Sequence, residues 1–235
     1  MLRKLDLRHV LFLDIETVPL SPGYASLEEA ERRLWDKKAR NLRDYREEEP
    51  EATYQRAGIY AEFARVVCIS TGIYSDHQLR VKSFAGHDEG LILRDFAALL
   101  QSFYSQEHHL LCAHNGKEFD FPFLARRMVV HGIELPDILD LAGKKPWEVR
   151  HLDTMELWKF GDYKSYTSLE LLVHILNIPN PKNDIDGSEV GRVYWVDNDL
   201  PRIVEYCQRD VVAIVRVMLR FQNKPLVADE NIIMM

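Results

Sequence analysis

The sequence predicts an α/β protein in which helices flank a mixed central sheet. Residues 9–15 form a nearly unbroken apolar run, which is typical of a central strand buried on both faces. Two strand-like segments, 65–74 and 78–84, are separated by a Ser-Asp-His turn at 75–77, a pattern that predicts an antiparallel hairpin. Helical and strand-like segments alternate after this hairpin, so the sheet is expected to combine parallel and antiparallel pairs.

Amphipathic spacing and end signals predict the remaining elements. They are a helix at 89–104, a buried strand at 109–113, and helices at 119–131, 167–176 and 199–221. Gly132 and Pro179 are the expected stop signals of two of these helices.

A densely charged segment follows the first predicted strand. The 235 residues suit a single domain, residues 1–235, with a charged helical insertion at about 21–60. A helical stripe is predicted at Leu27, Leu34, Leu42 and Tyr45. Because other apolar residues are sparse there, the insertion is not expected to form its own core.

Composition and charge restrict the function classes. Hydrophobic residues make up 46% of the chain and charged residues 29%, as in soluble globular proteins. No apolar run reaches the roughly 18 residues that a membrane span needs, and the N-terminus lacks a signal-peptide pattern. Cys68, Cys112 and Cys207 lie in apolar segments and are expected to be reduced core residues of a cytoplasmic protein. The net charge of −7 argues against a passive nucleic-acid binder, but less against an enzyme whose bound cations face phosphate.

Asp14 and Glu16 are the first candidate site residues. Side chains two apart on a strand point to the same face, so these carboxylates project together. Two parallel carboxylates on a buried strand lose hydration and repel each other unless positive charge lies between them. The alternative is a strand end at which the acids reach solvent and cap the turn.

Two later segments carry further candidates. Asp120 falls in the first turn of a predicted helix, after an Asn115-Gly116 turn, where the helix dipole favours an anion. Stabilisation of that helix is the alternative role. Tyr206 and Asp210 are four residues apart on a core-directed face of the last helix, where an acid is uncommon without a partner. A structural Tyr–Asp contact is the alternative there.

Together the three segments form the pattern DxE … NxxxFD … YxxxD, which resembles the motifs of the DEDD (DnaQ-like) exonuclease superfamily and implies a ribonuclease H-like fold. Glu205 stands where the histidine subclass carries histidine, so the resemblance is to the tyrosine subclass, with Tyr206. Residues 145–212 are also similar to predicted 3′–5′ exonucleases related to the proofreading domain of family B DNA polymerases. The likeness extends over about 9–221, and a free-standing exonuclease is expected.

The resemblance implies a two-metal site. Asp14 is expected to bridge two Mg²⁺ or Mn²⁺ ions, with Glu16 and Asp210 completing one site and Asp120 acting through water or on the other ion. An all-oxygen ligand set favours these metals over zinc. Glu16 is also a candidate acceptor for the terminal 3′-OH. Tyr206 is a poor base, since the ordinary tyrosine pKa is about 10, and is expected to orient the attacking water.

Residues beside the acids are the substrate-binding candidates. The backbone of Ile15 and Thr17 is expected to contact the terminal nucleotide. Asn115, Lys117 and Phe119 complete the predicted set, with Lys117 as a phosphate contact and Phe119 as a stacking partner for a base. Core packing of Phe119 and an ordinary surface role of Lys117 are the alternatives.

Five other polar residues are assigned mainly outside the catalytic set. Glu118 is expected to face solvent, and Asp153 to hold the loop that follows it. Asp184 and Asp186 are expected to cap the next helix. Lys182 is a second candidate phosphate contact.

The sequence therefore predicts a metal-dependent 3′–5′ exonuclease that acts on 3′ ends of single-stranded nucleic acid, with DNA favoured. An exoribonuclease of the same chemistry is the first alternative, because the 2′-OH contacts that separate RNA from DNA are not visible in a sequence. A catalytically silent binding module is the second. No membrane association is expected, and the sequence does not indicate protein partners.

Overall fold

The structure, a computed structural model, describes residues 2–42, 49–162, 166–179 and 185–235. Among these, one sheet contains β1 (Val10–Pro19), β2 (Ala64–Ser75), β3 (Gln78–Ala85), β4 (Leu110–Ala113), β5 (Leu152–Asp153) and β6 (Ile232–Met234). The strand order is β5-β4-β1-β2-β3-β6. β2 pairs antiparallel with β1 and β3, whereas the other neighbouring pairs are parallel. The predicted mixed sheet is confirmed.

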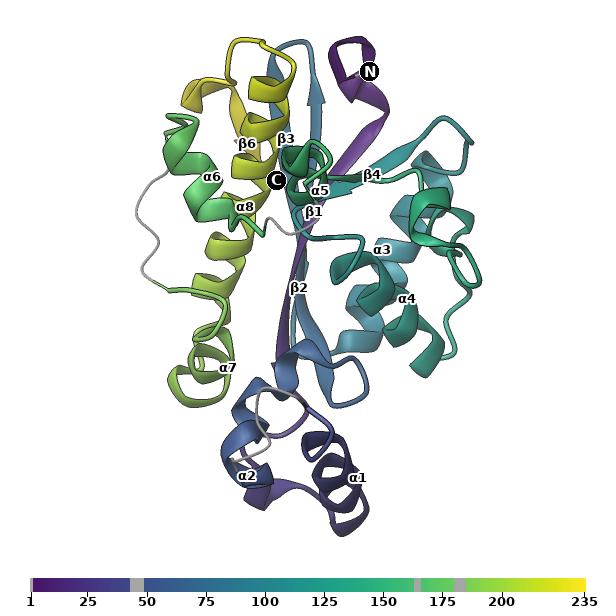
Figure 1. Cartoon of the computed structure of the whole chain (residues 1–235), viewed down its shortest axis with the longest axis vertical. Helices are drawn as coiled ribbons and strands as arrows, with labels where there is room; N and C mark the ends of the chain where they lie inside the picture. Colours follow the sequence, from purple (N-terminus) through teal and green to yellow (C-terminus); the bar gives the residue numbers. More distant parts are fainter. Residues whose placement is uncertain (1, 43–48, 163–165, 180–184) are drawn as a thin grey trace.

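Helices cover both faces of this sheet (Figure 1). The α-helices of the described residues are α1 (Glu29–Ala39), α2 (Pro50–Thr53), α3 (Glu89–Phe103), α4 (Asp120–Val130), α5 (Thr154–Lys159), α6 (Leu169–Ile175), α7 (Val190–Arg192) and α8 (Leu200–Phe221). α3 and α4 lie on one side of the sheet, and α8 with α6 lies on the other. No helix of the described residues is long and apolar enough to span a membrane.

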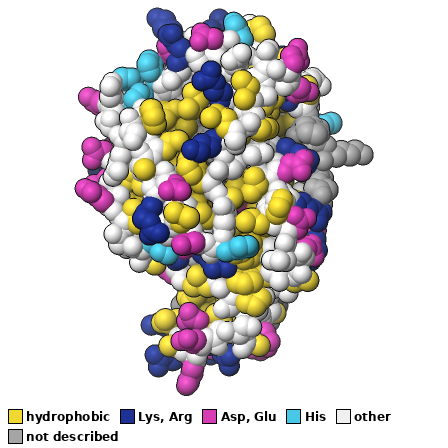
Figure 2. Space-filling view, turned by 180° about the vertical axis from the view of Figure 1, so that it is seen from behind, with side chains coloured by type: hydrophobic (Ala, Val, Ile, Leu, Met, Phe, Trp, Pro, Cys, Tyr) yellow, Lys and Arg dark blue, Asp and Glu magenta, His cyan; other side chains and the backbone are white. Residues whose placement is uncertain are grey.

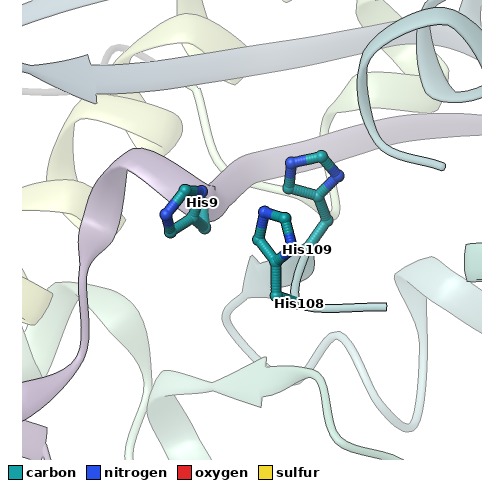
Figure 3. A group of neighbouring side chains, drawn as sticks. All are labelled: His9, His108 and His109. Carbon is teal, nitrogen blue, oxygen red and sulfur yellow. The ribbon is translucent and has the colours of Figure 1, made fainter. Parts of the chain in front are cut away.

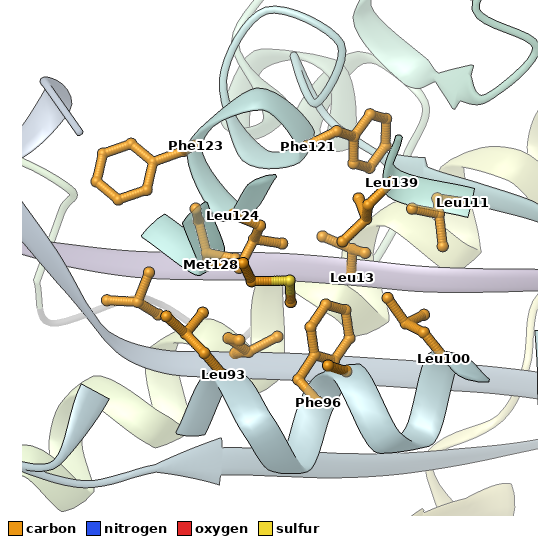
Figure 4. Packing of buried hydrophobic residues seen from close by; sticks show 14 of the residues in the cluster. Leu13, Leu93, Phe96, Leu100, Leu111, Phe121, Phe123, Leu124, Met128 and Leu139 are labelled. Carbon is orange, nitrogen blue, oxygen red and sulfur yellow. The ribbon is translucent and has the colours of Figure 1, made fainter. Parts of the chain in front are cut away.

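Strand β1 separates two cores because its side chains alternate between the faces of the sheet. Leu11, Leu13 and Ile15 point to the face covered by α3 and α4, where they join a cluster with Phe96 and Leu124 (Figure 4). All five side chains are at most 4% exposed. The apolar run predicted at the start of the chain is therefore a central strand, as expected.

The intervening residues of β1 face α8. Val10 and Phe12 are fully buried in a second cluster with apolar residues of that helix. Asp14 and Glu16 continue the same alternation, so they leave the strand on the α8 side. This places two acids at the interface between the sheet and its longest helix.

The predicted hairpin is present, and its turn is shorter than expected. Ser75 is the last residue of β2, and the two residues between the strands, Asp76 and His77, have φ values of 50° and 64°. Positive φ at both central positions defines the type I′ turn that suits the twist of paired strands.

The ends of the predicted helices agree with their capping residues. The side chains of Asp88, Ser168 and Asp199 accept hydrogen bonds from backbone amides at the starts of α3, α6 and α8. Gly132, with φ of 63°, lies two residues beyond the end of α4. These caps satisfy backbone groups that the helices leave open.

A buried ion pair fixes α4 against α3. The Arg127 guanidinium donates to both carboxylate oxygens of Glu89 at 2.9 and 2.6 Å and to the carbonyl oxygen of Ala61 at 2.8 Å. Glu89 also accepts from the Val66 amide. Burial would raise the pKa of Glu89, but these hydrogen bonds, with one from His131, hold it below its ordinary value. The pairing supports the helix that begins with Asp120.

The insertion packs differently from the prediction. Leu34, placed on the buried stripe, is 55% exposed, whereas its neighbour Trp35 is fully buried. Trp35 packs against Tyr54 and Phe63, which come from later segments of the chain. The insertion thus contains a small aromatic core of its own, contrary to expectation. Tyr45, the last residue of the predicted stripe, lies outside the described residues.

Basic and acidic side chains are both scattered among apolar areas on the face shown in Figure 2, and neither sign dominates there. The three cysteines, Cys68, Cys112 and Cys207, are free and fully buried, as predicted for core residues. Strand β6, which extends the sheet beside β3, was not predicted.

Candidate active site

Asp14 and Glu16 lie in the middle of the sheet. In the β1–β2 pairing Asp14 is opposite Ser70 and Glu16 is opposite Cys68, and the register shifts between Glu16 and Thr17. Such an irregularity bends a strand and re-aims its side chains. Glu16 is only 7% exposed. Both carboxylates are thus held on a rigid, buried strand.

A glycine allows α8 to approach this strand pair closely. A Cβ atom added at Gly72 of β2 would lie 2.7 Å from Cγ1 of Val211. Because Gly72 has no Cβ atom, α8 packs close to the sheet. The Sγ atom of Cys207 donates a hydrogen bond to the backbone oxygen of Asp14, at 3.3 Å. Potential ligand atoms of Asp14, Glu16 and Cys207 all lie within 4.8 Å of one another.

The same face of α8 carries Tyr206 and Asp210. The phenol of Tyr206 is hydrogen-bonded to the carboxylate of Asp210 one turn later. The charges of Asp210, Glu16 and Asp14 all act on Tyr206. The last predicted motif therefore meets the first across the sheet–helix interface.

Asp120 is positioned by a tightly packed loop between β4 and α4. Asn115 adopts a φ of 62°, and a Cβ atom at Gly116 would lie only 2.4 Å from Cβ of Ala113. The Asp153 carboxylate accepts hydrogen bonds from the backbone amide of Asn115 at 2.9 Å and from that of Lys117 at 3.2 Å. Asp120 is 3% exposed, and its carboxylate accepts a hydrogen bond from the backbone amide of Ile15.

The four carboxylates destabilise one another's charged forms. Burial raises the pKa of Asp14 well above its ordinary value, and the charges of Glu16, Asp210 and Asp120 add to the shift. Burial and Asp210 likewise raise the pKa of Glu16. Burial raises the pKa of Asp120 to about 8 and that of Asp210 to about 6. Among the described residues, none of the leading contributions to these shifts comes from a lysine or arginine.

This donor set fits divalent cations. The Oδ2 atom of Asp14 is buried and has no hydrogen-bond partner, which is costly for a carboxylate unless a cation is bound there. Hard carboxylate oxygens are the ligands that Mg²⁺ and Mn²⁺ prefer. The thiol of Cys207 is the one soft atom beside them, and its own pKa is raised well above the ordinary value by burial and by Cys68. It therefore remains protonated beside the oxygen donors.

The substrate-binding candidates lie around this cluster in different ways. The Ile15 side chain is buried in the core, so only its backbone faces the site. Thr17 donates its hydroxyl to the Gly58 oxygen at 2.7 Å, which ties β1 to the insertion. Phe119 is partly buried against Phe123, the packing given above as the alternative to stacking.

Lys117 is partly buried, and its ammonium lies 2.6 Å from the carboxylate of Glu156. This ion pair supports the alternative of a structural lysine, and a phosphate contact would require Lys117 to share or leave that partner. Glu118 is exposed, as predicted. Asp186 accepts from Ser188 as a turn residue. Asp184 and Lys182 lie outside the described residues.

Sequence reasoning missed two contributors to the site. Cys207 was assigned only to the core, although its position three residues before Asp210 places both on one helical face. Asp153 caps α5 by accepting from the Met155 amide, and it also holds the loop before Asp120. The second role depends on a contact across 38 residues, which no local pattern indicates.

A groove of about 600 Å³ adjoins the loop that carries Asp120. Its lining includes Asn115, Lys117, Asp153, Lys144 and Lys159. Of these residues, Asp153 also holds the loop before Asp120, and its charge contributes, after burial, to the raised pKa of Asp120. The groove is therefore an open surface beside the loop that carries Asp120.

Exposed aromatic side chains stand beside the groove. Trp147 is 76%, Phe160 78% and Tyr166 69% exposed. The ammonium of Lys145 lies 5.3 Å from the Trp147 ring centre, and that of Lys159 lies 4.4 Å from the Tyr166 ring centre. Such pairing of aromatic rings with lysines suits a surface that stacks bases and contacts phosphates.

Comparisons with known proteins identify a family and a similar fold. A model of the family described as "Predicted 3'-5' exonuclease related to the exonuclease domain of PolB" matches residues 59–229. The matched region contains Asp120, Tyr206 and Asp210, whereas Asp14 and Glu16 precede it. A search of curated proteins found no match.

Among solved structures, the family B DNA polymerase from the hyperthermophilic archaeon Pyrobaculum calidifontis is similar, with a TM-score of 0.54 and 17% identity. The alignment covers 90% of this chain and 24% of the polymerase chain, so the present chain spans about a quarter of that protein. At this identity the likeness concerns the fold, which is the ribonuclease H-like arrangement of a mixed sheet flanked by helices.

Proposed function

Because this chain belongs to the family of predicted 3′–5′ exonucleases related to the exonuclease domain of PolB, we propose that it hydrolyses phosphodiester bonds from the 3′ end of single-stranded nucleic acid. We further propose that it uses two divalent cations, Mg²⁺ or Mn²⁺, and that DNA is the favoured substrate. The relation of the family to a DNA polymerase domain supports the choice of DNA.

One observation carries the proposal: four carboxylates from three distant segments are buried together, and each has a raised pKa. A fold retains so unfavourable a cluster when a ligand compensates for it, and perturbed acids gather at functional sites. The unpartnered Oδ2 atom of Asp14 supports a positively charged ligand. A silent binding module has no need of this arrangement.

The roles of the acids follow from their positions. Asp14, Glu16, Asp120 and Asp210 would hold the cations, which when bound supply positive charge to the phosphate and lower the pKa of a coordinated water. The charges of Glu16, Asp210 and Asp120 all act on Asp14, so its carboxylate is within electrostatic reach of the other three. We therefore assign it the bridging position.

Tyr206 is assigned to positioning the attacking water. Burial and the nearby carboxylates raise the pKa of this phenol well above its ordinary value, so it stays protonated at neutral pH. A protonated phenol can hold a water molecule by a hydrogen bond but cannot remove its proton. The hydrogen bond between Tyr206 and Asp210 orients the ring.

The groove beside Asp120 supports a single-stranded substrate. Bases of an unpaired strand can stack on exposed rings, whereas those of a duplex are already stacked on one another. Trp147 and Phe160 are the exposed rings adjacent to groove-lining residues, and Lys144 and Lys159 are placed to contact the backbone. We propose that the 3′ end enters along this groove.

The proposal is tested with 5′-labelled single-stranded DNA and RNA of matched sequence, each with either a 3′-OH or a 3′-phosphate end. We expect a ladder that shortens stepwise from the 3′ end, faster on DNA, only with Mg²⁺ or Mn²⁺ and not with EDTA. Faster digestion of RNA would favour the exoribonuclease alternative. No cleavage of either polymer by folded, metal-bound protein would contradict an exonuclease.

A further inference from the structure

Three histidines, His9, His108 and His109, form a compact group (Figure 3). Potential ligand nitrogens of His9, His108 and His109 all lie within 4.8 Å of one another. The ring centres of His9 and His108 are 4.5 Å apart, and those of His108 and His109 are 4.4 Å apart. His9 and His108 are exposed and His109 is partly buried.

Strand pairing builds this group. β1 and β4 are parallel neighbours, and Val10 is paired with Leu110. His9 and His109 each precede a member of that pair, so the sheet register places them side by side. His108 adds a third imidazole from the turn that leads into β4. The arrangement therefore depends on the rigid sheet rather than on a chance meeting of long loops.

The nitrogen atoms are available to a metal. Burial, together with the nearby His108 and His9, lowers the pKa of His109, which favours its neutral form. The polar contacts of the group are weak: the Gln106 amide donates to Nδ1 of His109 at 3.3 Å, and Nε2 of His9 is 3.8 Å from an Asp6 carboxylate oxygen. That carboxylate is already held by Arg8. A bound metal would have to offset little more than the Gln106 hydrogen bond.

We propose that His9, His108 and His109 form a binding site for a borderline transition-metal cation, with Zn²⁺ as the representative ion. Three imidazole nitrogens complete most of a tetrahedral shell and leave one position for water. Imidazole selects zinc, nickel and copper, whereas the carboxylates at the other site select magnesium and manganese. Nothing in the proposal depends on nuclease activity.

The two sites are separate. His9 immediately precedes β1, and Asp14 follows Val10, the first residue of that strand, by four residues, which corresponds to about 13 Å of extended chain. A cation held by the three histidines would join the start of β1 to the start of β4, at the edge where these two parallel strands begin. Binding there stabilises the folded chain by an amount that rises with the logarithm of one plus the ratio of the metal concentration to Kd. The site is therefore assigned a structural rather than a catalytic role.

The test is calorimetric titration of untagged protein with Zn²⁺ in excess Mg²⁺, which occupies the carboxylate site. We expect one Zn²⁺ per chain, and about a tenfold or greater loss of affinity in His9→Ala and in His108→Ala. His174→Ala, which removes an exposed histidine on α6, is the matched control and should bind as the wild type does. All three positions are exposed, so the variants should fold.

Two further readings decide the location of the metal. Co²⁺ bound to the three histidines should show visible bands and no sulfur-to-metal charge-transfer band. Co²⁺ bound by the thiolate of Cys207 would show that charge-transfer band as well. Zinc should also raise the melting temperature of the wild type but not of the His9→Ala, His108→Ala double variant. Unchanged Zn²⁺ affinity in that variant, or a thiolate band in the wild type, would overturn the assignment.

Discussion

The Sγ atom of Cys207 donates a hydrogen bond to the backbone oxygen of Asp14 across 193 residues of sequence, at 3.3 Å. The contact joins α8 to β1 directly beneath the acidic cluster. Asp210 lies on the same helical face as Cys207, so the contact also sets the position of Asp210 relative to Asp14. The buried thiol is thus a candidate positioning residue for the proposed metal site.

We predict that Cys207→Ala lowers the free energy of unfolding by about 1–2 kcal/mol, because a hydrogen bond and some packing are lost. Nuclease activity should fall less than about tenfold, since the oxygen donors remain. Urea denaturation and initial rates measure the two effects. Cys112→Ala, at an equally buried cysteine outside the acidic cluster, should show a similar stability loss with no change in rate. Complete loss of activity in folded Cys207→Ala would instead make the thiol a ligand.

The metal-free protein should lose stability as the pH rises. The folded pKa values of Asp120, about 8, and Asp210, about 6, exceed the ordinary value of about 4. The folded state then holds protons that the unfolded chain has released, so the free energy of unfolding falls between about pH 4 and pH 8. Thermal melts in EDTA measure this slope.

Asp120→Asn should flatten that slope, and saturating Mg²⁺ should raise the melting temperature more at pH 8 than at pH 6, because it binds the ionised acids. If neither Asp120→Asn nor Mg²⁺ changed the pH dependence of the melting temperature, the charged forms of the four acids would not be destabilised in the folded state.

Gly116→Ala tests the loop that carries Asp120. The added Cβ atom would lie 2.4 Å from Cβ of Ala113 and 2.9 Å from the Phe121 ring, so the loop must shift. We expect a stability loss of about 1–3 kcal/mol and a rate loss of about tenfold or more. Gly23→Ala, where a Cβ atom meets nothing within 4 Å, should be silent in both measurements. A wild-type rate for Gly116→Ala would mean that the position of Asp120 is not critical.

Trp147→Ala tests the proposed path of the single strand. Stacking of one base on an aromatic side chain contributes about 1–3 kcal/mol, so KM for single-stranded DNA should rise about tenfold or more with kcat little changed. Phe103→Ala removes a similarly exposed ring on α3, outside the groove lining, and should leave KM unchanged. Equal KM values for both variants would place the substrate elsewhere.

Most of the sheet and its long helices could be predicted from the sequence, because β1 contains an almost unbroken apolar run and the apolar residues of α8 recur with the helical period. The insertion could not. Trp35 is buried by Tyr54 and Phe63, and such long-range aromatic contacts override the spacing that favoured Leu34. Strand β6 was missed because its three residues are too few to show a period.

The acidic residues of the candidate site could be predicted from the sequence, but the residues that hold them in position could not. Asp14, Glu16, Asp120 and Asp210 stand out because carboxylates on buried segments are rare. Asp153 does not, since its hydrogen bonds to the Asn115 loop exist only in the folded chain.

The central claim is that the buried acids hold the cations that drive cleavage, and Asp14→Asn tests it most directly. Its time course on 5′-labelled single-stranded DNA with Mg²⁺ or Mn²⁺ is compared with that of the wild type, beside melts of both proteins in EDTA. We predict a protein at least as stable as the wild type, because a carboxyl group whose charged form the fold disfavours is replaced by a neutral amide, with a rate lowered by about a thousandfold or more. A folded Asp14→Asn that shortens DNA from the 3′ end at the wild-type rate would contradict the account.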